Sequence, residues 1–324
     1  MKAAVVSGAA GFVGSHLVDA LLESGYVVCG IDNLITGDLA NLSGARQSSA
    51  FHFIEADISG NGDALREHIE RESGGEPTIV FHLASPASPV DYAALPVETM
   101  LANSRGTQVC LELSKAWGAK FLFASTSESY GDPLEHPQRE TYWGNVNPVG
   151  PRSCYDESKR FGEALVMAYL RISAVDARIV RIFNTYGPRM RRNDGRVVPN
   201  FIAQAVSGHP LTIYGDGEQT RAFCYVDDLV RGIMLCAESS KTVGLVVNLG
   251  NPEEHTIRSF AEIVCEIANV PLRLEHLDLP PDDPTRRCPD ISRARQLVGW
   301  EPLIPLREGL RRTIEAYRVT AVPR

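Results

Sequence analysis

The sequence predicts an α/β fold in which a doubly wound parallel sheet is joined to a second, smaller α/β lobe. Two observations carry this prediction. Strand-like and helix-like segments alternate through the first half of the chain, as expected for parallel strands joined by right-handed crossovers. After Phe183 the chain becomes rich in Gly, Pro, Arg and Asn, and its elements become shorter. With 324 residues, the chain has room for about two packed units of ~150 residues each.

Hydrophobic periodicity places these elements along the chain. Short apolar runs predict strands at residues 2–7, 26–32, 51–54, 78–84, 120–125, 178–183 and 245–249. Apolar residues at helical spacing predict helices at residues 13–24, 92–116, 154–172 and 227–239. The stretch from 227 to 249 has the pattern of a return to the sheet. We therefore expect one domain from residues 1–183 with 225–250, and a second lobe from residues 184–224 with 251–324.

Composition limits the possible partners of the chain. Lys and Arg number 32 against 40 Asp and Glu, a net charge of −8, so we expect no nucleic-acid partner. The seven cysteines form no C-x-x-C pair, which predicts reduced thiols and no metal site. No apolar run approaches the ~20 residues that span a bilayer, so we expect a soluble, cytoplasmic protein without a membrane partner.

The segment from Gly8 to Gly14 has the pattern G-x-x-G-x-x-G between a predicted strand and a predicted helix. Glycines there allow backbone N–H groups at a helix N-terminus to approach a pyrophosphate. Asp32 ends the second strand, 18 residues after Gly14, where a carboxylate accepts both ribose hydroxyls of NAD. The pattern predicts an NAD site; the alternative, a tight turn without a ligand, leaves Asp32 unexplained.

Other candidates follow the third and fourth strands, since ligands gather at the carboxyl ends of parallel strands. Asp57 and Ile58 follow the third strand, where they would flank the adenine. A helix cap at Asp57 is the alternative. Ala84 and Ser85 end the fourth strand, where the cofactor is expected to lie.

Tyr155 and Lys159 form a Y-x-x-x-K pair that places both side chains on one helix face. To act as a base at neutral pH, Tyr155 needs its pKa lowered from ~10 by about 3 units. We expect a nearby ammonium to supply much of that shift and the positive nicotinamide ring of the cofactor to add to it. Tyr155 would then take a proton from a hydroxyl while hydride leaves the same carbon. Ser127 and Glu128 close the fifth strand and would share this cleft. Singly, these residues could instead be a packing tyrosine, a turn hydroxyl and a surface acid.

Together these motifs resemble those of the extended short-chain dehydrogenase/reductases, which have a Rossmann NAD-binding domain and act on nucleotide sugars. Within that group the chain is similar to the UDP-glucuronate decarboxylase (UDP-xylose synthase) family. The similar segments are residues 81–89, 125–133, 142–160, 181–190, 193–202, 214–223, 248–257 and 286–302. The resemblance therefore covers nearly the whole chain.

The resemblance implies a complete reaction. NAD⁺ would oxidise C4 of the glucuronosyl ring, CO₂ would leave from the resulting β-keto acid, and the retained NADH would reduce C4 to give UDP-xylose. The resemblance assigns Tyr155 as the base. It assigns Lys159 as the residue that lowers the pKa of Tyr155 and contacts the ribose. Glu128 would be an acid/base and orienting carboxylate near C5. Arg287 would bind the departing carboxylate or supply the C5 proton, and a guanidinium suits the first task because it grips a carboxylate bidentately.

The predicted site falls into three sets. The catalytic set is Tyr155, Lys159, Thr126, Ser127, Glu128 and Arg287, with Thr126 and Ser127 as oxygen-binding hydroxyls. The NAD-binding set is Gly8, Gly11, Phe12, Val13, Gly14, Asp32, Asn33, Asp57, Ile58, Ala84, Tyr155 and Lys159. The substrate-binding set is Ser85, Asn184, Arg196, Tyr214, Arg221 and Arg287. For any single arginine a surface ion pair is the alternative, and for Tyr214 it is core packing.

The chain departs from the family where Glu98 and Leu101 replace the two lysines of an N-P-I-K-T-L-K-T-N block. The loss of the second lysine suggests a weaker grip on the acid substrate, and therefore some release of UDP-4-keto-xylose with NADH. After Thr36 and Gly37 the basic run of the family is also replaced, by residues 38–40, which would loosen the adenosine end of the site.

Three other functions remain open. A nucleotide-sugar 4,6-dehydratase would carry an acid before Glu128, where this chain has Ser127. A 4-epimerase would need neither Glu128 nor Arg287. A catalytically silent NAD-binding scaffold would not need Tyr155 and Lys159 together. The resemblance also implies a homodimer through the helices at 92–116 and 154–172, and intrachain packing of those helices is the alternative.

Overall fold

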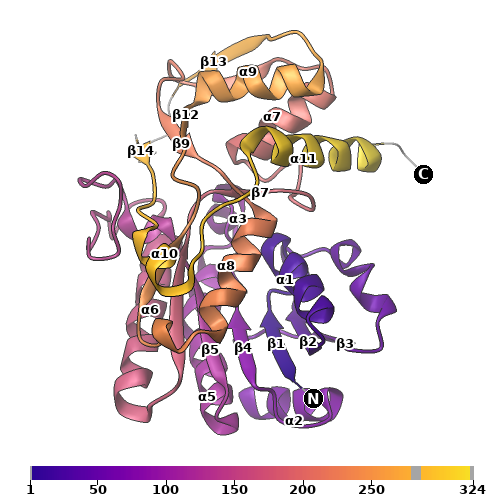
Figure 1. The fold of residues 1–324 in the computed structure, drawn as a ribbon, viewed down its shortest axis with the longest axis vertical. Helices are drawn as coiled ribbons and strands as arrows, with labels where there is room; N and C mark the ends of the chain where they lie inside the picture. The colour runs from indigo at the N-terminus through magenta and orange to yellow at the C-terminus, as the bar shows by residue number, and fades with distance from the viewer. Residues whose placement is uncertain (1, 279–285, 322–324) are drawn as a thin grey trace.

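The computed structural model describes residues 2–278 and 286–321, and a seven-stranded sheet forms its centre (Figure 1). In spatial order the strands are β11 (Val246–Leu249), β6 (Ala177–Ile182), β5 (Lys120–Thr126), β4 (Ile79–His82), β1 (Ala3–Ser7), β2 (Val27–Asp32) and β3 (Phe51–Glu55). Every pairing in this sheet is parallel. The predicted fold class and all seven predicted strands are confirmed, with boundaries shifted by at most two residues.

The order of the strands reverses between β1 and β4. The chain runs outward from β1 through β2 to β3, then returns to β4 and runs outward on the other side through β5 and β6 to β11. At such a switch point the loops after neighbouring strands diverge and leave a crevice at the carboxyl ends of the strands. The glycine-rich turn after β1 and the loop after β4 border that crevice.

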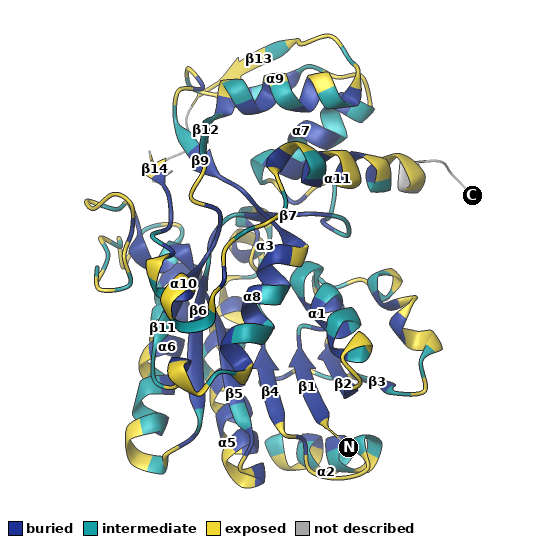
Figure 2. Ribbon diagram, in the orientation of Figure 1, coloured by how far each residue is buried: buried dark blue, intermediate teal, exposed yellow. Residues whose placement is uncertain are grey.

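Helices cover both faces of the sheet (Figure 1). Alternate residues of a strand point to opposite faces, and Val6 and Val5 of β1 accordingly enter two separate apolar clusters. The first cluster holds α1 (Phe12–Glu23) and α8 (Val226–Glu238) against the sheet. The second holds α2 (Gly62–Ser73), α5 (Thr107–Trp117) and α6 (Ser153–Ser173). The strands are buried almost throughout (Figure 2).

The prediction of one helix at residues 92–116 is wrong. The chain forms α3 (Pro89–Ala94), α4 (Pro96–Leu101), a π-helical turn (Ala102–Gly106) and then α5. Pro96 lacks the N–H that a continuous helix needs, so Leu95 leaves the helical region with φ −128° and ψ 53°. The helix α2 was not predicted, although Asn61 caps it and Leu65 and Ile69 lie one turn apart.

A second group of elements lies beyond the carboxyl edge of the sheet (Figure 1). The helices α7 (Val197–Val206), α9 (Ile257–Ala268) and α11 (Leu306–Ala321) pack on one another. The short strands around them are β7 (Thr185–Tyr186) with β10 (Cys224–Tyr225), β8 (Leu211–Tyr214) with β13 (Leu274–Leu277), and β9 (Thr220–Ala222) with β12 (Glu254–Thr256) and β14 (Arg286–Arg287).

One segment differs from the predicted division into two lobes. Residues 251–324 were assigned to the second lobe, but α10 (Ser292–Val298) packs against β11 and α8 of the sheet domain. Buried Trp300 just beyond α10 donates from Nε1 to the carbonyl of Asp228 at 2.8 Å. This contact draws the chain back to the sheet before α11. Residues 279–285, within the predicted second lobe, lie outside the described residues.

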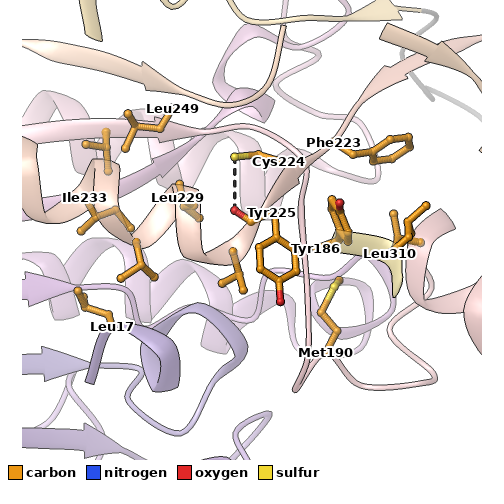
Figure 3. Packing of buried hydrophobic residues seen from close by; sticks show 14 of the residues in the cluster. Leu17, Tyr186, Met190, Phe223, Cys224, Tyr225, Leu229, Ile233, Leu249 and Leu310 are labelled. Atoms are coloured by element: carbon orange, nitrogen blue, oxygen red, sulfur yellow. Dashed lines mark hydrogen bonds between the residues drawn. The ribbon is translucent and has the colours of Figure 1, made fainter. Parts of the chain in front are cut away.

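The two groups of elements share one apolar core (Figure 3). Tyr186 and Tyr225 pack edge to face with ring centroids 5.6 Å apart, between α8 and α11. Leu229 and Ile233 of α8 continue the same core toward α1, and Leu310 of α11 closes it. Within residues 2–278 and 286–321, no helix combines the length and the apolar character needed to cross a membrane.

Replacing Trp300 by Ala is expected to lower the free energy of unfolding by about 3–5 kcal/mol, because a fully buried indole and its hydrogen bond to Asp228 are lost. Urea denaturation followed by circular dichroism measures the change. Trp143→Ala is the matched control, since Trp143 is 87% exposed and its replacement should change stability by at most ~0.5 kcal/mol. Equal effects of the two substitutions would contradict the assignment of Trp300 to the core.

Candidate active site

Two adjoining cavities lie at the carboxyl edge of the sheet. The larger has a volume of about 460 Å³ and the smaller about 220 Å³. Phe12, Val13, Leu83, Ser85 and Arg196 line both, so the two spaces meet at the turn after β1 and the loop after β4. One dinucleotide and one sugar substrate could therefore lie in contact.

The predicted NAD-binding residues divide between the two cavities. Those that line the smaller one are Gly8, Gly11, Phe12, Val13, Gly14, Asp32, Asn33, Asp57, Ile58 and Ala84. Tyr155 and Lys159 line the larger one. Because Phe12 and Val13 border both spaces, a group reaching from the smaller cavity past them would arrive beside Tyr155.

The glycine-rich turn is held by contacts that exclude any side chain. A Cβ at Gly14 would lie 1.9 Å from the carbonyl oxygen of Gly8, and a Cβ at Gly8 would lie 2.8 Å from the backbone nitrogen of Ala84. Gly8 also has φ +76°, which favours glycine. Glycine is thus required here for two reasons. One is the expected close approach to a pyrophosphate, and the other is the tight packing of the turn on α1 and on the end of β4. This turn fits a dinucleotide because its N–H groups begin α1 without a side-chain cap.

Asp32 is fixed at the end of β2 by two backbone hydrogen bonds. Its Oδ2 accepts from the N–H of Ala10 at 2.9 Å, and its Oδ1 accepts from the N–H of Leu34 at 2.8 Å. Burial raises the pKa of Asp32, and these two hydrogen bonds oppose that effect. The carboxylate thus stands ready beside the glycine-rich turn, where it would repel a 2′-phosphate.

Asp57 does not cap α2, because Asn61 holds that position. Asp57 instead accepts from the N–H and the hydroxyl of Ser59 at 2.8 and 2.6 Å, and from Nδ2 of Asn33 at 3.2 Å. It therefore joins the loops after β2 and β3 on the wall of the smaller cavity. The helix-cap alternative for Asp57 is wrong.

Tyr155 and Lys159 lie on the first two turns of α6 and are both buried. The ammonium of Lys159 donates to the carbonyl of Ala124 at 2.8 Å and lies 5.9 Å from the centre of the Tyr155 ring. Burial lowers the pKa of Lys159 to about 7, partly offset by the charge of Glu163. Burial also raises the pKa of Tyr155 to about 12, although Thr126 and Arg196 lower it. The prediction that Lys159 supplies much of a downward shift in the pKa of Tyr155 is therefore wrong for the protein without ligands.

Thr126, Ser127 and Glu128 follow one another at the end of β5, and all three line the larger cavity with Tyr155. The hydroxyl of Thr126 accepts from the N–H of Glu128 at 3.2 Å and so begins the 3₁₀ turn Ser127–Tyr130. This local cap turns the chain sharply. It leaves the two hydroxyls and the carboxylate beside one another on the cavity wall.

Glu128 is held by two arginines. Arg287 donates to both of its carboxylate oxygens, and Arg152 donates to Oε2 at 2.6 Å. Burial alone would raise the pKa of Glu128, but the charges of Arg287 and Arg152 outweigh it and lower that pKa to about 2. Glu128 is therefore ionised at neutral pH, which favours its predicted orienting role over its predicted role as an acid.

The predicted substrate-binding residues all line the larger cavity: Ser85, Asn184, Arg196, Tyr214, Arg221 and Arg287. Arg221 on β9 and Arg287 on β14 are register partners in a parallel strand pair. This pairing brings the two arginines to the same wall of the larger cavity. Arg196 is paired with Asp194 through two hydrogen bonds of 2.5 and 2.7 Å. Tyr214 is 38% exposed, so core packing does not explain it.

Three residues of this site were not foreseen. Arg152 precedes Tyr155 by three positions, a spacing that would have placed it near the same helix end. Tyr92 stacks on Tyr155 with ring centroids 5.2 Å apart, and its buried hydroxyl has no hydrogen-bond partner among the described residues. Asp156 is buried beside this cluster, and burial together with the charge of Glu128 raises its pKa to about 7. No sequence pattern indicates Tyr92, because its contact with Tyr155 joins two separate helices, α3 and α6.

One cluster of possible metal ligands also occurs within the described residues, His136 with Glu254 and Cys288. The guanidinium of Arg286 lies in the same cluster, 2.9 Å from Nε2 of His136 and 3.3 Å from Oε2 of Glu254. The guanidinium of Arg286 thus already provides a positive charge beside Glu254, and the cluster has the composition of an ion-pair network.

The sequence matches the model of the NAD dependent epimerase/dehydratase family over residues 4–250. The chain belongs to this family. Relatives include UDP-glucuronic acid decarboxylase 1 of Arabidopsis thaliana, 50% identical over 97% of this chain and 69% of its own, and UDP-glucuronic acid decarboxylase 1 of Xenopus tropicalis, 47% identical over 98% and 72%. The family depends on NAD, which confirms the predicted cofactor.

Solved structures of the family share the whole fold. UDP-glucose 4-epimerase of Thermotoga maritima, solved with UDP-glucose, superposes with a TM-score of 0.89 at 32% identity, covering 98% of this chain and 99% of that chain. UDP-glucuronic acid 4-epimerase of Bacillus cereus, solved with UDP-glucuronic acid and NAD, gives a TM-score of 0.87 at 31% identity, covering 98% and 100%. The family fold therefore extends beyond residue 250, through the second lobe.

Gly14→Ala is expected to weaken NAD binding at least about tenfold, or ~1.4 kcal/mol, because the new methyl group would displace the carbonyl of Gly8 and open the turn. Isothermal titration calorimetry with NAD⁺ measures the change. Gly44→Ala is the control, since Gly44 has φ −71° and no heavy atom within 4 Å of the added carbon. An unchanged affinity in Gly14→Ala would place the cofactor elsewhere.

Asp156→Asn is expected to stabilise the protein in a pH-dependent way. The folded pKa of about 7 lies above the unfolded value near ~3.9, so stability contributed by the protonated carboxyl is lost as the pH rises through 7. The variant should melt at a higher temperature than the parent at about pH 8, and at the same temperature at about pH 4. Thermal melts with Glu157→Gln as the control test this. A variant that melts lower at about pH 8 would show that Asp156 is needed as an anion.

Proposed function

We propose that this protein decarboxylates UDP-glucuronic acid to UDP-xylose through a 4-keto intermediate, with NAD as its cofactor. Its NAD-binding domain would comprise residues 1–183 with 225–250, and the nucleotide-sugar lobe residues 184–224 with 251–324, apart from α10 (Ser292–Val298), which packs on the sheet domain. The observation that carries the proposal is the pairing of Arg287 with Glu128 in the cavity that also holds Tyr155 and Lys159. The relatives named UDP-glucuronic acid decarboxylase support the same reaction.

The diphosphate and the uridine would lie toward the second lobe. Arg196 and Arg221 supply positive charge on that side of the larger cavity, where Asn184 and Tyr214 add polar contacts. The sugar ring would then reach the end of β5, between Tyr155 and Arg287. Tyr92 would offer its buried hydroxyl to the sugar, since no described residue bonds it.

The first step removes the proton of the C4 hydroxyl. Tyr155 would accept that proton, and Thr126 and Ser127 would hold the C4 oxygen while it becomes a ketone. NAD bound along the smaller cavity supplies the hydride acceptor and later the hydride donor, and its oxidised ring adds the positive charge that Tyr155 needs. Lys159 would hold its ammonium toward the pair through the carbonyl of Ala124.

The second step breaks the C5–C6 bond. With a ketone at C4, the carboxylate is β to a carbonyl, so CO₂ leaves and the bonding electron pair passes into the C4 carbonyl as an enolate. Arg287 would hold the carboxylate for this step, because its buried Nε has no hydrogen-bond partner among the described residues and its other nitrogens already bind a carboxylate. The enolate would then take a proton at C5 from water, and hydride returned to C4 together with the proton held by Tyr155 would restore the alcohol.

The rival reactions fit the cavity less well. A 4,6-dehydratase must protonate a leaving 6-hydroxyl, and Ser127 stands where an acid would be needed. A 4-epimerase must present both faces of a C4 ketone to the cofactor, and one that acts on UDP-glucuronic acid would differ from a decarboxylase by releasing no CO₂. A silent scaffold would not require Tyr155 and Lys159 buried on the same cavity wall.

We also propose a cytoplasmic homodimer. All seven cysteines are free, which suits a reducing compartment. The helices α4 and α6 pack on each other and leave large apolar side chains in solvent, including Met100 at 48%, Phe161 at 52% and Ile172 at 79% exposure. A second copy that placed its own α4 and α6 on this face would cover these side chains.

The proposed reaction predicts that the protein with NAD⁺ and UDP-glucuronic acid releases CO₂ and forms UDP-xylose. Tyr155→Phe should slow CO₂ release by about 10²–10⁴-fold, since ring packing stays and only the proton acceptor is lost. Mass spectrometry of the nucleotide sugars and trapping of ¹³CO₂ measure both. CO₂ release as fast in Tyr155→Phe as in the parent would reject Tyr155 as the base, and a panel of UDP-sugars would reveal a different substrate.

Leu101→Lys is expected to reduce the escape of UDP-4-keto-xylose. Leu101 is 44% exposed on the wall of the smaller cavity, so a lysine there could reach into the site and add a positive charge. The parent should accumulate free NADH, followed by its absorbance at 340 nm, and the variant should accumulate at least about threefold less. Val97→Lys, on the same helix and 61% exposed, is the control. A parent that forms only UDP-xylose and no free NADH would remove the basis for this prediction.

A further inference from the structure

The side chain of Arg287 depends on a short segment that contributes little by itself. The strand β14 has two residues, and seven residues before it lie outside the described chain. Arg287 is nevertheless 4% exposed and bonds both oxygens of Glu128. Something else in the structure must hold its backbone, because bidentate pairing requires the guanidinium and the carboxylate to be closely aligned.

The segment after Arg287 is bound by Gln138, which is fully buried. The N–H of Gln138 donates to the carbonyl of Cys288 at 2.9 Å, and the N–H of Asp290 donates to the carbonyl of Gln138 at 2.9 Å. The side chain adds a third bond, since Oε1 of Gln138 accepts from the N–H of Cys288 at 2.8 Å. Gln138 thus binds both the N–H and the carbonyl of Cys288, the residue next to Arg287.

Asn248 joins this segment to the central sheet. It is fully buried on β11, and its Nδ2 donates to the carbonyls of both Gln138, at 3.0 Å, and Asp290, at 3.1 Å. Its Oδ1 accepts from the hydroxyl of Tyr130 at 2.8 Å. Tyr130 ends the same 3₁₀ turn that contains Glu128. Both partners of the Arg287–Glu128 pair are therefore tied to one amide side chain.

We infer that Asn248, acting through Gln138, is a positioning residue that sets Arg287 for recognition of the substrate carboxylate. This inference rests on the proposed function for the identity of the carboxylate. It makes a distinct claim, however: loss of Asn248 should affect ligands that carry a carboxylate on C5 and spare those that do not. A residue needed only for stability would affect both kinds of ligand alike.

The test compares two ligands that differ by the carboxylate alone, UDP-glucuronic acid and UDP-xylose. Asn248→Asp keeps an acceptor for Tyr130 and loses both donors to the carbonyls of Gln138 and Asp290. The titrations are made with the NAD-loaded protein carrying Tyr155→Phe, with and without Asn248→Asp, so that UDP-glucuronic acid is not turned over. Asn248→Asp should then bind UDP-glucuronic acid at least about tenfold more weakly and change the binding of UDP-xylose by less than about threefold. Equal weakening of both ligands, or no change in either, would overturn the inference.

Two further variants provide a second test and a control. Gln138→Met removes the acceptor for the N–H of Cys288 and should give the same contrast between ligands if Asn248→Asp does not fold. Tyr130→Phe removes the one side-chain hydrogen bond of Asn248 that leads to the turn of Glu128 and not to the Arg287 segment, and it should change the ligand ratio less than Asn248→Asp does. Thermal melts confirm that each variant is folded at the assay temperature.

The same experiment separates the inference from the proposed function. A parent that prefers UDP-glucuronic acid to UDP-xylose but releases no CO₂ would reject the decarboxylation and leave the test of Asn248 valid. A parent that shows no preference for the carboxylate ligand would reject the inference directly, because Arg287 would then have no carboxylate to recognise.

Discussion

The ion pair between Glu128 and two arginines is the contact on which the candidate site depends. Its members come from the end of β5, from the start of α6 and from β14 in the second lobe. Each charge would be costly to bury alone, and together they satisfy one another. The pair therefore ties the second lobe to the carboxyl edge of the sheet beside Tyr155. A substrate carboxylate that enters this cluster must share Arg287 with Glu128.

Competition between Glu128 and a substrate carboxylate for Arg287 links substrate binding to the protonation of Glu128. The pKa of Glu128 is held near 2 by Arg287 and Arg152 against the opposing effect of burial. A second carboxylate on Arg287 would weaken that hold, and burial would then favour the protonated form of Glu128. Asp156 already shows this balance, since it is buried near the same charges and its pKa is raised to about 7. The cluster as a whole can thus adjust its protons when an acidic sugar arrives.

The parts of the fold that sequence predicts well are those set by local chemistry. The turn from Gly8 to Gly14 and the carboxylate of Asp32 require particular residue types at particular spacings, and the structure places them together as expected. The buried strands are runs too apolar to be anything but interior. Long-range features were less accessible. Tyr92 of α3 stacks on Tyr155 of α6, and Asn248 donates to Gln138 across 110 positions, and no periodic pattern predicts either contact.

The electrostatics of Tyr155 show the same limit more sharply. The i, i+4 spacing of Tyr155 and Lys159 correctly places both on one helix face, yet spacing carries no information about burial. Burial raises the pKa of the phenol and lowers that of the ammonium to about 7, so at neutral pH the phenol by itself stays protonated and the ammonium is only partly charged. Positive charge must therefore enter the cavity with the bound ligands before the phenol can accept a proton. A base of this kind would gain its charge beside the positive ring of bound NAD⁺, when the reactants are already enclosed.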